Sequence, residues 1–432
     1  MTTRDERLAL EAADWTRPGR IPLLRTARHA LAVPIGQARW TARLVTGGVR
    51  SPKAIMSGWL REQLAVLGPS AAEVARLLEQ AGGMAPAPLV EEFRDRPVVP
   101  DPLTADTVWA ILRRSFPGRV ASLDCEPLAV SPLSQLHRAV LDDGTQALFR
   151  VARPGVRAQL EADIRLAATL LIPAQLVPPF NHANPLGVLR SAARQAVEHT
   201  DLRNDALNTA ELAAAVPKVA VAEPLDGLSS PDAVGFAAVP GAVPLARALG
   251  RVDRRKAAAA LQAVTVEAAL ADGIFHADLR SEHLFVLEDG SLLIVGCSAL
   301  GRLGTATRRA VLDYVTALFG GDHPGQVDAL GRLGVLSPGT DTAALLDDLR
   351  AAPELSPKAL FTGGDAAGKV LGSLAVRHGF QAPVEIVQWF RALLTFRAVT
   401  HHVAPAMPLA QALFPLIPRL AEINGRLGNP RS

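Results

Sequence analysis

Short apolar runs flank a turn signal at two places along the chain. Residues 139–151 enclose the triplet Asp-Asp-Gly at 142–144, and residues 284–295 enclose Glu-Asp-Gly at 288–290. Asp-Gly between two apolar runs is typical of a β-hairpin, because these residues adopt the backbone angles that a tight turn requires. The pattern therefore predicts one hairpin in each half of the chain.

Longer apolar–polar patterns typical of helices fill much of the remaining chain. Residues 21–49 show two short amphipathic stretches broken at Pro34, residues 254–270 form an Ala-rich helix, and helical stretches punctuated by Gly and Pro follow from about residue 303. Pro-rich stretches near residue 100 indicate a boundary. We expect an α+β protein with three parts: a basic helical extension over 1–100, a small β-containing lobe over 101–245 and a helical lobe over 246–432.

The composition excludes several classes of function. Only 4% of the 432 residues are aromatic, with a single Tyr, so the aromatic platforms that bind single-stranded nucleic acid are missing and we expect no nucleic-acid partner. Two cysteines exclude a disulfide scaffold and a Cys-x-x-Cys site. The first ten residues carry four charges, and no apolar run reaches the roughly 18–20 residues of a membrane-spanning helix. We therefore expect a cytoplasmic protein.

Positive charge is concentrated in an early segment. The net charge is only +3, yet no acidic residue lies between Asp14 and Glu62, while residues 17–61 carry nine Arg and Lys residues. Basic amphipathic helices bind anionic membrane surfaces, at about 1 kcal/mol per basic residue. One interpretation is that residues 17–61 hold the protein peripherally on the inner face of a membrane. The other is a helical hairpin that packs on its own domain with a solvated basic face.

A loop that presents His276 and Asp278 precedes the second hairpin. The run Gly-Ile-Phe-His-Ala-Asp at 273–278 leads into residues 284–295, and the far end of that hairpin returns toward the same loop. Kinase-like phosphotransferases place a catalytic Asp, a metal-binding Asn and a metal-binding Asp on this plan. The pattern favours a site of that kind with Asp278 as the candidate base, which would accept the proton of a substrate hydroxyl.

Further blocks agree with one kinase-like family in order and spacing. Residues 126–139 (EPLAVSPLSQLHRA) resemble the Ala-rich loop and first strand of the ABC1/UbiB (AarF) atypical kinase-like family, and residues 151–156 (VARPGV) are similar to its V-Q-R-P-G-V run. The resemblance covers roughly residues 65–425. It implies a two-lobed protein-kinase-like fold with an N-terminal helical extension. It also implies a nucleotide pocket that includes Ala129, Val130, Ser131 and Gln135.

The same resemblance implies a class of activity and of ligand. Members of the family are ATP-binding, with ATPase or small-molecule and lipid-linked kinase functions associated with isoprenoid quinone biosynthesis and lipid homeostasis. ATP is accordingly the expected nucleotide, and a lipid-like small molecule is the expected second ligand. The resemblance does not identify a protein partner.

The chain departs from the family pattern at the positions that hold metal ions. His283 occupies the metal-binding Asn position, and Gly296 stands where the family has the metal-binding Asp. Neutral imidazole is a poor ligand for Mg²⁺, which prefers oxygen, and glycine offers no side chain. Glu282 is the alternative ligand from the neighbouring position. We expect Mg²⁺ not to be bound in the ordinary way and no other metal site, since His323 and His401-His402 lack partners at ligand spacing.

The phosphate-contacting positions differ as well. Arg150 occupies the position of the strand lysine, and Asp205 that of its helical Glu partner. The Lys-x-Gly-Gln motif of the family's extension corresponds to residues 77–80, where Leu77 and Glu79 replace the Lys and the Gly and only Gln80 is retained. We expect an Arg150–Asp205 pair, either beside a nucleotide or as an interior salt bridge without one.

Together these substitutions favour a pseudokinase that acts as a binding or regulatory module. Two alternatives stay open. One is a divergent ATPase or small-molecule kinase that uses Asp278 with Glu282 or another carboxylate. The other is a peripheral membrane lipid-binding scaffold. Cys297, which follows Gly296, is expected to be buried and inert.

Overall fold

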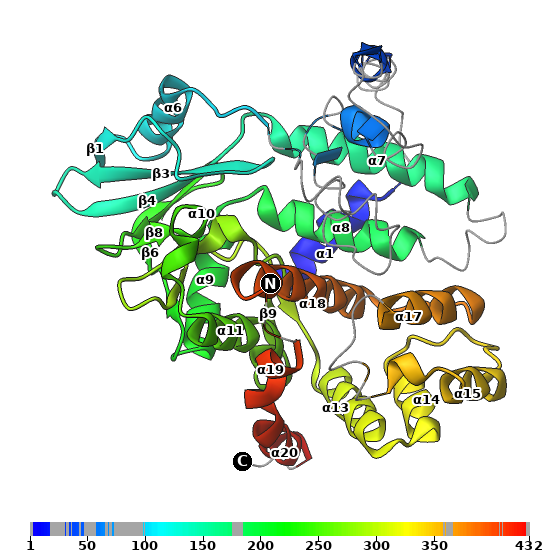
Figure 1. Ribbon diagram of the computed structural model, residues 1–432. Coiled ribbons are helices and arrows are strands. Elements are labelled where there is room, and N and C mark those ends of the chain that lie inside the picture. The colour runs from blue at the N-terminus through cyan, green and yellow to red at the C-terminus, as the bar shows by residue number, and fades with distance from the viewer. Residues whose placement is uncertain are drawn as a thin grey trace. The chain divides into compact units, whose positions relative to one another are not determined.

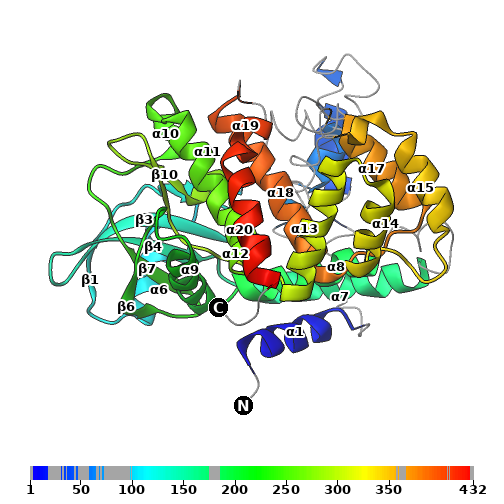
Figure 2. The ribbon, with the colours of Figure 1, turned by 90° about the horizontal axis from the view of Figure 1, so that it is seen from below.

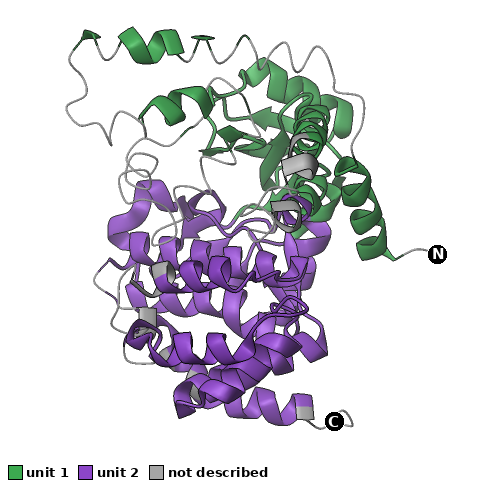
Figure 3. Ribbon diagram, turned by 90° about the vertical axis from the view of Figure 1, so that its right-hand side faces the viewer, with its two compact units in different colours: residues 1–172, 192–204, 224–238 green, residues 173–191, 205–223, 239–432 purple. Residues whose placement is uncertain are grey.

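The chain forms two compact units that interleave along the sequence (Figures 1 and 3). Unit 1 comprises residues 1–172, 192–204 and 224–238, and unit 2 comprises 173–191, 205–223 and 239–432. The division predicted at residues 100 and 245 stays a prediction. The computed structural model describes residues 3–17, 31, 34–35, 37–42, 45–46, 58–64, 68, 71–72, 98, 100–174, 185–356, 359, 366–405, 407 and 409–428.

Unit 1 is built on an antiparallel sheet with the strand order β1-β3-β4-β7-β6, in which β2 also pairs with β3. The turn between β3 and β4 holds Gly144 at a φ of +85°, a region that glycine enters without strain. The first predicted hairpin is therefore confirmed. The strands are β1 (Val120–Leu123), β2 (Ala129–Val130), β3 (Ser134–Leu141), β4 (Gln146–Ala152), β6 (Pro224–Ser229) and β7 (Ala233–Ala237).

One amphipathic helix covers this sheet. Helix α6 (Ala105–Ser115) begins after Thr104, whose hydroxyl accepts the Thr107 N–H. Its buried residues pack with apolar side chains of β3 and β4, and the rings of Phe116 and Phe149 lie 5.7 Å apart. The spacing of three to four residues between buried positions explains why this segment is helical.

Three further helices belong largely to unit 1, namely α1 (Arg4–Trp15), α7 (Val156–Ala174) and α8 (Pro185–His199). Figure 2 shows α1 alongside α7 and α8. Helix α1 begins with a reciprocal capping box between Thr3 and Glu6, and it buries Leu8, Ala12 and Trp15 on one face. In the earlier predicted helical segment, residues 31, 34–35, 37–42 and 45 are helical, and residues 21–30 lie outside the described part of the chain.

Unit 2 contains two small sheets. A four-stranded sheet has the order β5-β11-β10-β8, and a two-stranded sheet pairs β9 with β12. The second predicted hairpin is confirmed as β10–β11, with Phe285 opposite Leu293. The strands are β5 (Ala220–Val221), β8 (Val243–Pro244), β9 (Ile274–His276), β10 (Leu284–Val286), β11 (Leu292–Ile294) and β12 (Leu300–Arg302).

Helices make up the remainder of unit 2, as predicted for the chain beyond residue 303. They are α9 (Arg203–Ala215), which begins in unit 1, α10 (Leu245–Ala248), α11 (Arg254–Gln262), α12 (Ala268–Ala271), α13 (Thr305–Gly320), α14 (His323–Arg332), α15 (Thr342–Arg350), α17 (Ala366–Arg377), α18 (Val384–Val403), α19 (Leu409–Leu413) and α20 (Ile417–Gly428). A π-helical turn at Ala263–Glu267 joins α11 to α12.

The apolar core of unit 2 lies where α9, α11 and α18 meet the strands. It includes Leu212, Leu261, Ile294 and Phe396, all of them buried. Sheet-bearing and helical parts together confirm the α+β class. Among the helices that the structure describes, none has the length and apolar character needed to cross a membrane.

Candidate functional site

The loop that carries Asp278 is held by short strands at both of its ends. Strand β9 pairs with β12 so that His276 lies opposite Leu300, and a 3-10 turn at Ser281–His283 leads into β10. Gly273 starts the motif at a φ of +80°, and a Cβ there would lie 2.7 Å from the Leu303 carbonyl oxygen. Only glycine fits at this position, which explains the Gly that begins the Gly-x-x-His motif.

His276 is a buried structural residue of this loop. Its Nδ1 accepts the Asp278 N–H at 3.3 Å, and its Nε2 lies 3.2 Å from the Gly296 carbonyl oxygen. Because Nδ1 is the acceptor, the proton of the neutral ring is on Nε2, which donates to Gly296. His276 thus ties the Asp278 backbone to the loop that contains Gly296.

Asp278 forms an ion pair within its own loop. The Arg280 Nε donates to Asp278 Oδ1 at 2.7 Å, and the two side chains are only 6% and 8% exposed. A guanidinium at this distance stabilises the ionised carboxylate. The sequence analysis identified Asp278 and missed Arg280, although an arginine two residues after the candidate base was a visible signal.

His283, at the metal-binding Asn position, uses both ring nitrogens in hydrogen bonds. Its Nδ1 accepts the Arg280 N–H at 3.2 Å, and its Nε2 lies 3.1 Å from the Ser298 hydroxyl. The neutral ring therefore carries its proton on Nε2 and offers no lone pair to a cation. The His276 and His283 rings meet edge to face, with their centroids 5.2 Å apart.

Gly296 occupies the second metal-binding position with a φ of +82°. The next residue, Cys297, is buried, and its N–H is shared between Asp205 Oδ1 at 2.6 Å and Thr209 Oγ1 at 2.8 Å. Asp205 and Thr209 lie one turn apart on α9. Helix α9 therefore fixes the backbone of this loop through Asp205. This is the carboxylate that we expected to pair with Arg150.

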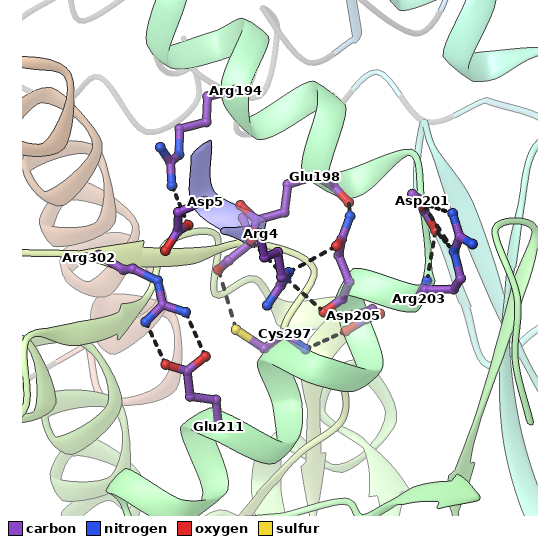
Figure 4. Close-up of polar contacts among 12 residues, drawn as sticks. Arg4, Asp5, Arg194, Glu198, Asp201, Arg203, Asp205, Glu211, Cys297 and Arg302 are labelled. Carbon is purple, nitrogen blue, oxygen red and sulfur yellow. Dashed lines mark hydrogen bonds and ion pairs between the residues drawn. The ribbon is translucent and has the colours of Figure 1, made fainter. Parts of the chain in front are cut away.

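A second contact joins α9 to β12 (Figure 4). Arg302 makes a two-pronged interaction with Glu211, with Nη1–Oε1 at 2.5 Å and Nη2–Oε2 at 2.7 Å. Both side chains are about one third exposed, so solvent screens the pair. Its geometric effect is to set the position of α9 beside the strand that follows the Gly296 loop.

The Ala-rich loop of unit 1 is held by backbone contacts. Ala129 and Val130 form β2, opposite Leu136 and Gln135 of β3. The Ser131 hydroxyl accepts the Ser134 N–H at 3.0 Å, and the Ser131 carbonyl accepts from Arg153 Nε at 2.9 Å. Arg153 belongs to the Arg-Pro-Gly-Val run, so the two segments that carried the resemblance contact each other.

Gln135 belongs to a buried hydrogen-bond chain. Its Oε1 accepts the Leu103 N–H, and its Nε2 lies 3.0 Å from His137 Nε2. His137 Nδ1 is 3.0 Å from the Asp124 carbonyl and must donate to it, so Nε2 accepts from Gln135. Burial lowers the pKa of His137 below its ordinary value, although the hydrogen bond to Asp124 acts the other way. Both the oxygen and the nitrogen of the Gln135 side-chain amide are therefore hydrogen-bonded within the protein.

The remaining predicted site residues are placed as follows. Arg150 is a buried central residue of β4, opposite Leu136 and Val234. Arg150 lies in unit 1 and Asp205 in unit 2, so the pair between them stays a prediction. Leu77, Glu79 and Gln80 lie outside the described residues.

The described residues do not fit a Mg²⁺ ion at the family's positions. His283 has no lone pair to offer, Gly296 has no side chain, and Asp278 is paired with Arg280. Within the described part of the chain, no group of three or more His, Cys, Asp or Glu side chains is arranged to hold a metal ion. We therefore derive no step through a bound metal.

Comparisons with known proteins agree with this arrangement of segments. A family model described as the ABC1 atypical kinase-like domain matches residues 112–329. The chain is similar to an uncharacterized protein of Mycobacterium tuberculosis, at 26% identity over 395 residues that cover 85% of this chain and 79% of that one. It is also similar to a probable protein kinase UbiB of Tolumonas auensis, at 22% identity with coverage of 90% and 76%.

One solved structure supports the fold. The Rv3197–erythromycin complex from Mycobacterium tuberculosis matches with a TM-score of 0.51 and 19% identity, covering 78% of this chain and 88% of that chain. At this level of identity the likeness shows a shared fold.

Proposed function

Because the chain belongs to the ABC1 atypical kinase-like family, we propose that it is a degenerate member that acts as a binding or regulatory module and does not catalyse Mg²⁺-dependent phosphoryl transfer. The observation that carries the proposal is the hydrogen bonding of His283 through both ring nitrogens, next to a loop in which Gly296 replaces a carboxylate. Phosphoryl transfer depends on cations that neutralise developing charge. Losing one such contact costs about 3–4 kcal/mol of transition-state stabilisation.

The Asp278–Arg280 pair supports the same proposal. Asp278 Oδ1 accepts from Arg280 Nε at 2.7 Å, so one of the two oxygens that could take a substrate proton already accepts a hydrogen bond within the loop. We keep ATP as the candidate nucleotide and a lipid-like or isoprenoid-like molecule as the candidate second ligand. The link to quinone or lipid metabolism is part of this proposal.

The test is a calorimetric titration with ATP, with Mg²⁺ and with EDTA, together with an ATPase assay. We expect ATP binding to be no tighter with Mg²⁺ than with EDTA, and turnover to stay at background. Micromolar binding that requires Mg²⁺ or Mn²⁺ and is abolished in Asp278→Asn would establish the divergent ATPase or kinase instead. Glu282→Gln then tests whether Glu282 supplies the missing ligand.

A second candidate function, peripheral attachment to an anionic membrane, is favoured by one observation in unit 1. Leu31, Ile35 and Val45 are 67%, 49% and 83% exposed, whereas Trp40 is buried at 4%. Trp40 packs on Gly58, where a Cβ would lie 2.6 Å from the indole.

Exposed apolar side chains within a segment that carries nine basic residues match the chemistry of an anionic bilayer. Co-sedimentation with phosphatidylglycerol-containing vesicles should exceed that with pure phosphatidylcholine vesicles, and it should fall when Leu31 and Val45 are changed to Ser. Equal sedimentation with both vesicles, or none with either, would exclude this function. The substitution Thr41→Ser, at another exposed position of the same segment, is the control.

A further inference from the structure

Helix α1 is attached to unit 1 by a buried apolar face and by charged contacts at its edges. Its buried face is narrow, with Leu8, Ala12 and Trp15, and the Arg157 guanidinium lies 5.4 Å from the centre of the Trp15 ring. Acidic side chains of α1 pair with arginines of α7 and α8 at three places, namely Asp5–Arg194 at 2.8 Å, Glu11–Arg157 and Asp14–Arg165 at 2.6 Å. Salt and competing charges weaken contacts of this kind.

One basic residue of α1 reaches the start of α9 (Figure 4). Arg4 Nε donates to Asn204 Oδ1 at 3.2 Å, and Arg4 Nη2 lies 3.6 Å from Glu198, whose carboxylate is buried. Asn204 Nδ2 in turn donates to the Glu198 carbonyl at 3.3 Å. Arg4 thus joins the end of α8 to the first turn of α9.

The residue after Asn204 is Asp205, which holds the Cys297 N–H at 2.6 Å. Asn204 and Asp205 are consecutive residues of one helix, so a rotation of the first turn of α9 moves both side chains. Because the helix is rigid, the Arg4–Asn204 contact and the Asp205–Cys297 contact can be coupled through its first turn. No ligand is needed for this coupling, because every contact is within the chain.

We propose that α1 is a charge-held clip that fixes the first turn of α9 and thereby controls the Gly296–Cys297 loop. Release of α1 by salt, or by a partner that competes for its charged contacts, would loosen the hydrogen bond between Asp205 and Cys297. The proposal does not rest on the pseudokinase function, because it makes no use of nucleotide or metal.

The test is amide hydrogen exchange on the full chain, comparing Arg4→Ala with Arg7→Ala. Arg7 is an exposed arginine on the same helix, so the pair matches the change in charge and propensity. We expect Arg4→Ala to speed exchange about tenfold at residues 203–209 and at Cys297, as the loss of a charge-assisted hydrogen bond allows. Arg7→Ala should leave both segments at the wild-type rate. Faster exchange confined to α1, α7 and α8 would overturn the proposal.

A charge-swap pair of variants distinguishes the loss of one ion pair from a general loss of folding. Asp5→Arg places two arginines together, and we expect it to speed exchange at Cys297. Adding Arg194→Asp restores an opposite-charge pair and should return most of the protection. If the double variant exchanges at Cys297 as fast as the single variant does, the clip does not control the loop.

Discussion

Under the proposed function, His283 and Gly296 determine whether the loop can hold a metal ion. Both ring nitrogens of His283 are hydrogen-bonded, and Gly296 has no side chain, so neither residue offers a ligand atom from its side chain. The backbone of Gly296 has a φ of +82°, a region that Asp enters more readily than most residues. The loop therefore keeps a conformation in which a carboxylate could be reinstalled.

Restoring both ligands is expected to create a cation requirement. In His283→Asn with Gly296→Asp we expect ATP binding at least tenfold tighter with Mg²⁺ than with EDTA, because oxygen ligands return. The left-handed Asp should cost about 1–2 kcal/mol of folding stability. Calorimetric titration measures the first and urea unfolding the second. His283→Asn with Gly296→Ala keeps the backbone strain and the Asn oxygen but lacks the carboxylate, and equal metal dependence there would show that the Asp carboxylate is not the cause.

The Asp278–Arg280 pair predicts a characteristic pattern of stability. Arg280→Met leaves the Asp278 carboxylate almost buried without this cation and should lower the free energy of unfolding by roughly 3–5 kcal/mol. Adding Asp278→Asn removes the buried charge, so the double variant should be more stable than Arg280→Met alone. Chemical denaturation at neutral pH compares them. A double variant less stable than the single one would show that the pair is not the source of the effect.

His137 predicts a pH dependence with a definite sign. Its pKa is lowered in the folded protein by burial, while in the unfolded chain it titrates near its ordinary value of about 6.5. Below pH ~6.5 the unfolded state therefore binds a proton that the folded state refuses, so stability falls as the pH is lowered toward the folded pKa. Urea midpoints at pH ~7.5 and ~5.5 should differ less in His137→Gln than in the wild type, and an equal difference would assign the effect to other groups.

Single residues could be located from the sequence, but their contacts could not. The assignment of His283 and Gly296 to the metal-binding positions rests on the family resemblance and stays a prediction. The pairing of Asp278 with Arg280 depends on the 3-10 turn that follows, which no local pattern indicates. The pocket role of Gln135 stays a prediction, and the hydrogen bonds of its amide to Leu103 and His137 depend on residues that no local pattern brings together.

At the scale of elements, the short β9–β12 pair holds the candidate site through close packing. A Cβ on Gly301 would lie 2.1 Å from the ring of Phe275, which is fully buried and lies directly opposite on β9. The Phe275 ring therefore packs directly on the backbone of Gly301. The Arg302–Glu211 contact, one residue later, adds α9 to the same arrangement.

Gly301→Ala is expected to lower the free energy of unfolding by about 1–3 kcal/mol, because the buried ring has to shift. Gly304→Ala is the control, since a Cβ there meets nothing within 4 Å; because Gly304 is the N-cap of α13, we expect a loss of about 0.5–1 kcal/mol. Thermal or urea unfolding checks both. Similar losses in the two variants would mean that the contact with Phe275 is not the cause.

Elements with a strong local signal were predictable, and those that depend on distant partners were not. The two hairpins carry Asp-Gly turns and the helices after residue 303 carry clear periodicity. Helix α1 has three buried residues and otherwise depends on arginines more than 140 positions away, such as Arg157 and Arg165. The strands β5, β8 and β12 have only two or three residues each, too few for a pattern.

On the scale of the whole molecule, the chain passes repeatedly between the two units. Unit 2 takes residues 205–223 from the middle of the chain, and these supply β5, most of α9 and the Asp205 carboxylate. The core of unit 2 includes Leu212, Val216 and Leu245 from this region and its vicinity. Sequence patterns suggested a continuous helical lobe, because they do not show which early segments return to it.

Two fragments test whether residues 205–245 are needed for unit 2 to fold. A fragment of residues 246–432 lacks β5, β8 and α9, so its four-stranded sheet is reduced to an isolated hairpin, which is marginal in water. We expect it to unfold without a cooperative transition. A fragment of residues 205–432 keeps these elements and should show a sigmoidal urea transition by circular dichroism. A cooperative transition in the shorter fragment would support the predicted boundary at residue 246.

The two cysteines differ in a way that makes the loop observable in solution. Cys125 is exposed, whereas Cys297 is buried and its Sγ donates to the Ala299 carbonyl at 3.3 Å. A maleimide reagent should label the first thiol at once and the second only during transient openings. Mass spectrometry of the doubly labelled species would then time those openings in the unmodified protein, with no engineered probe.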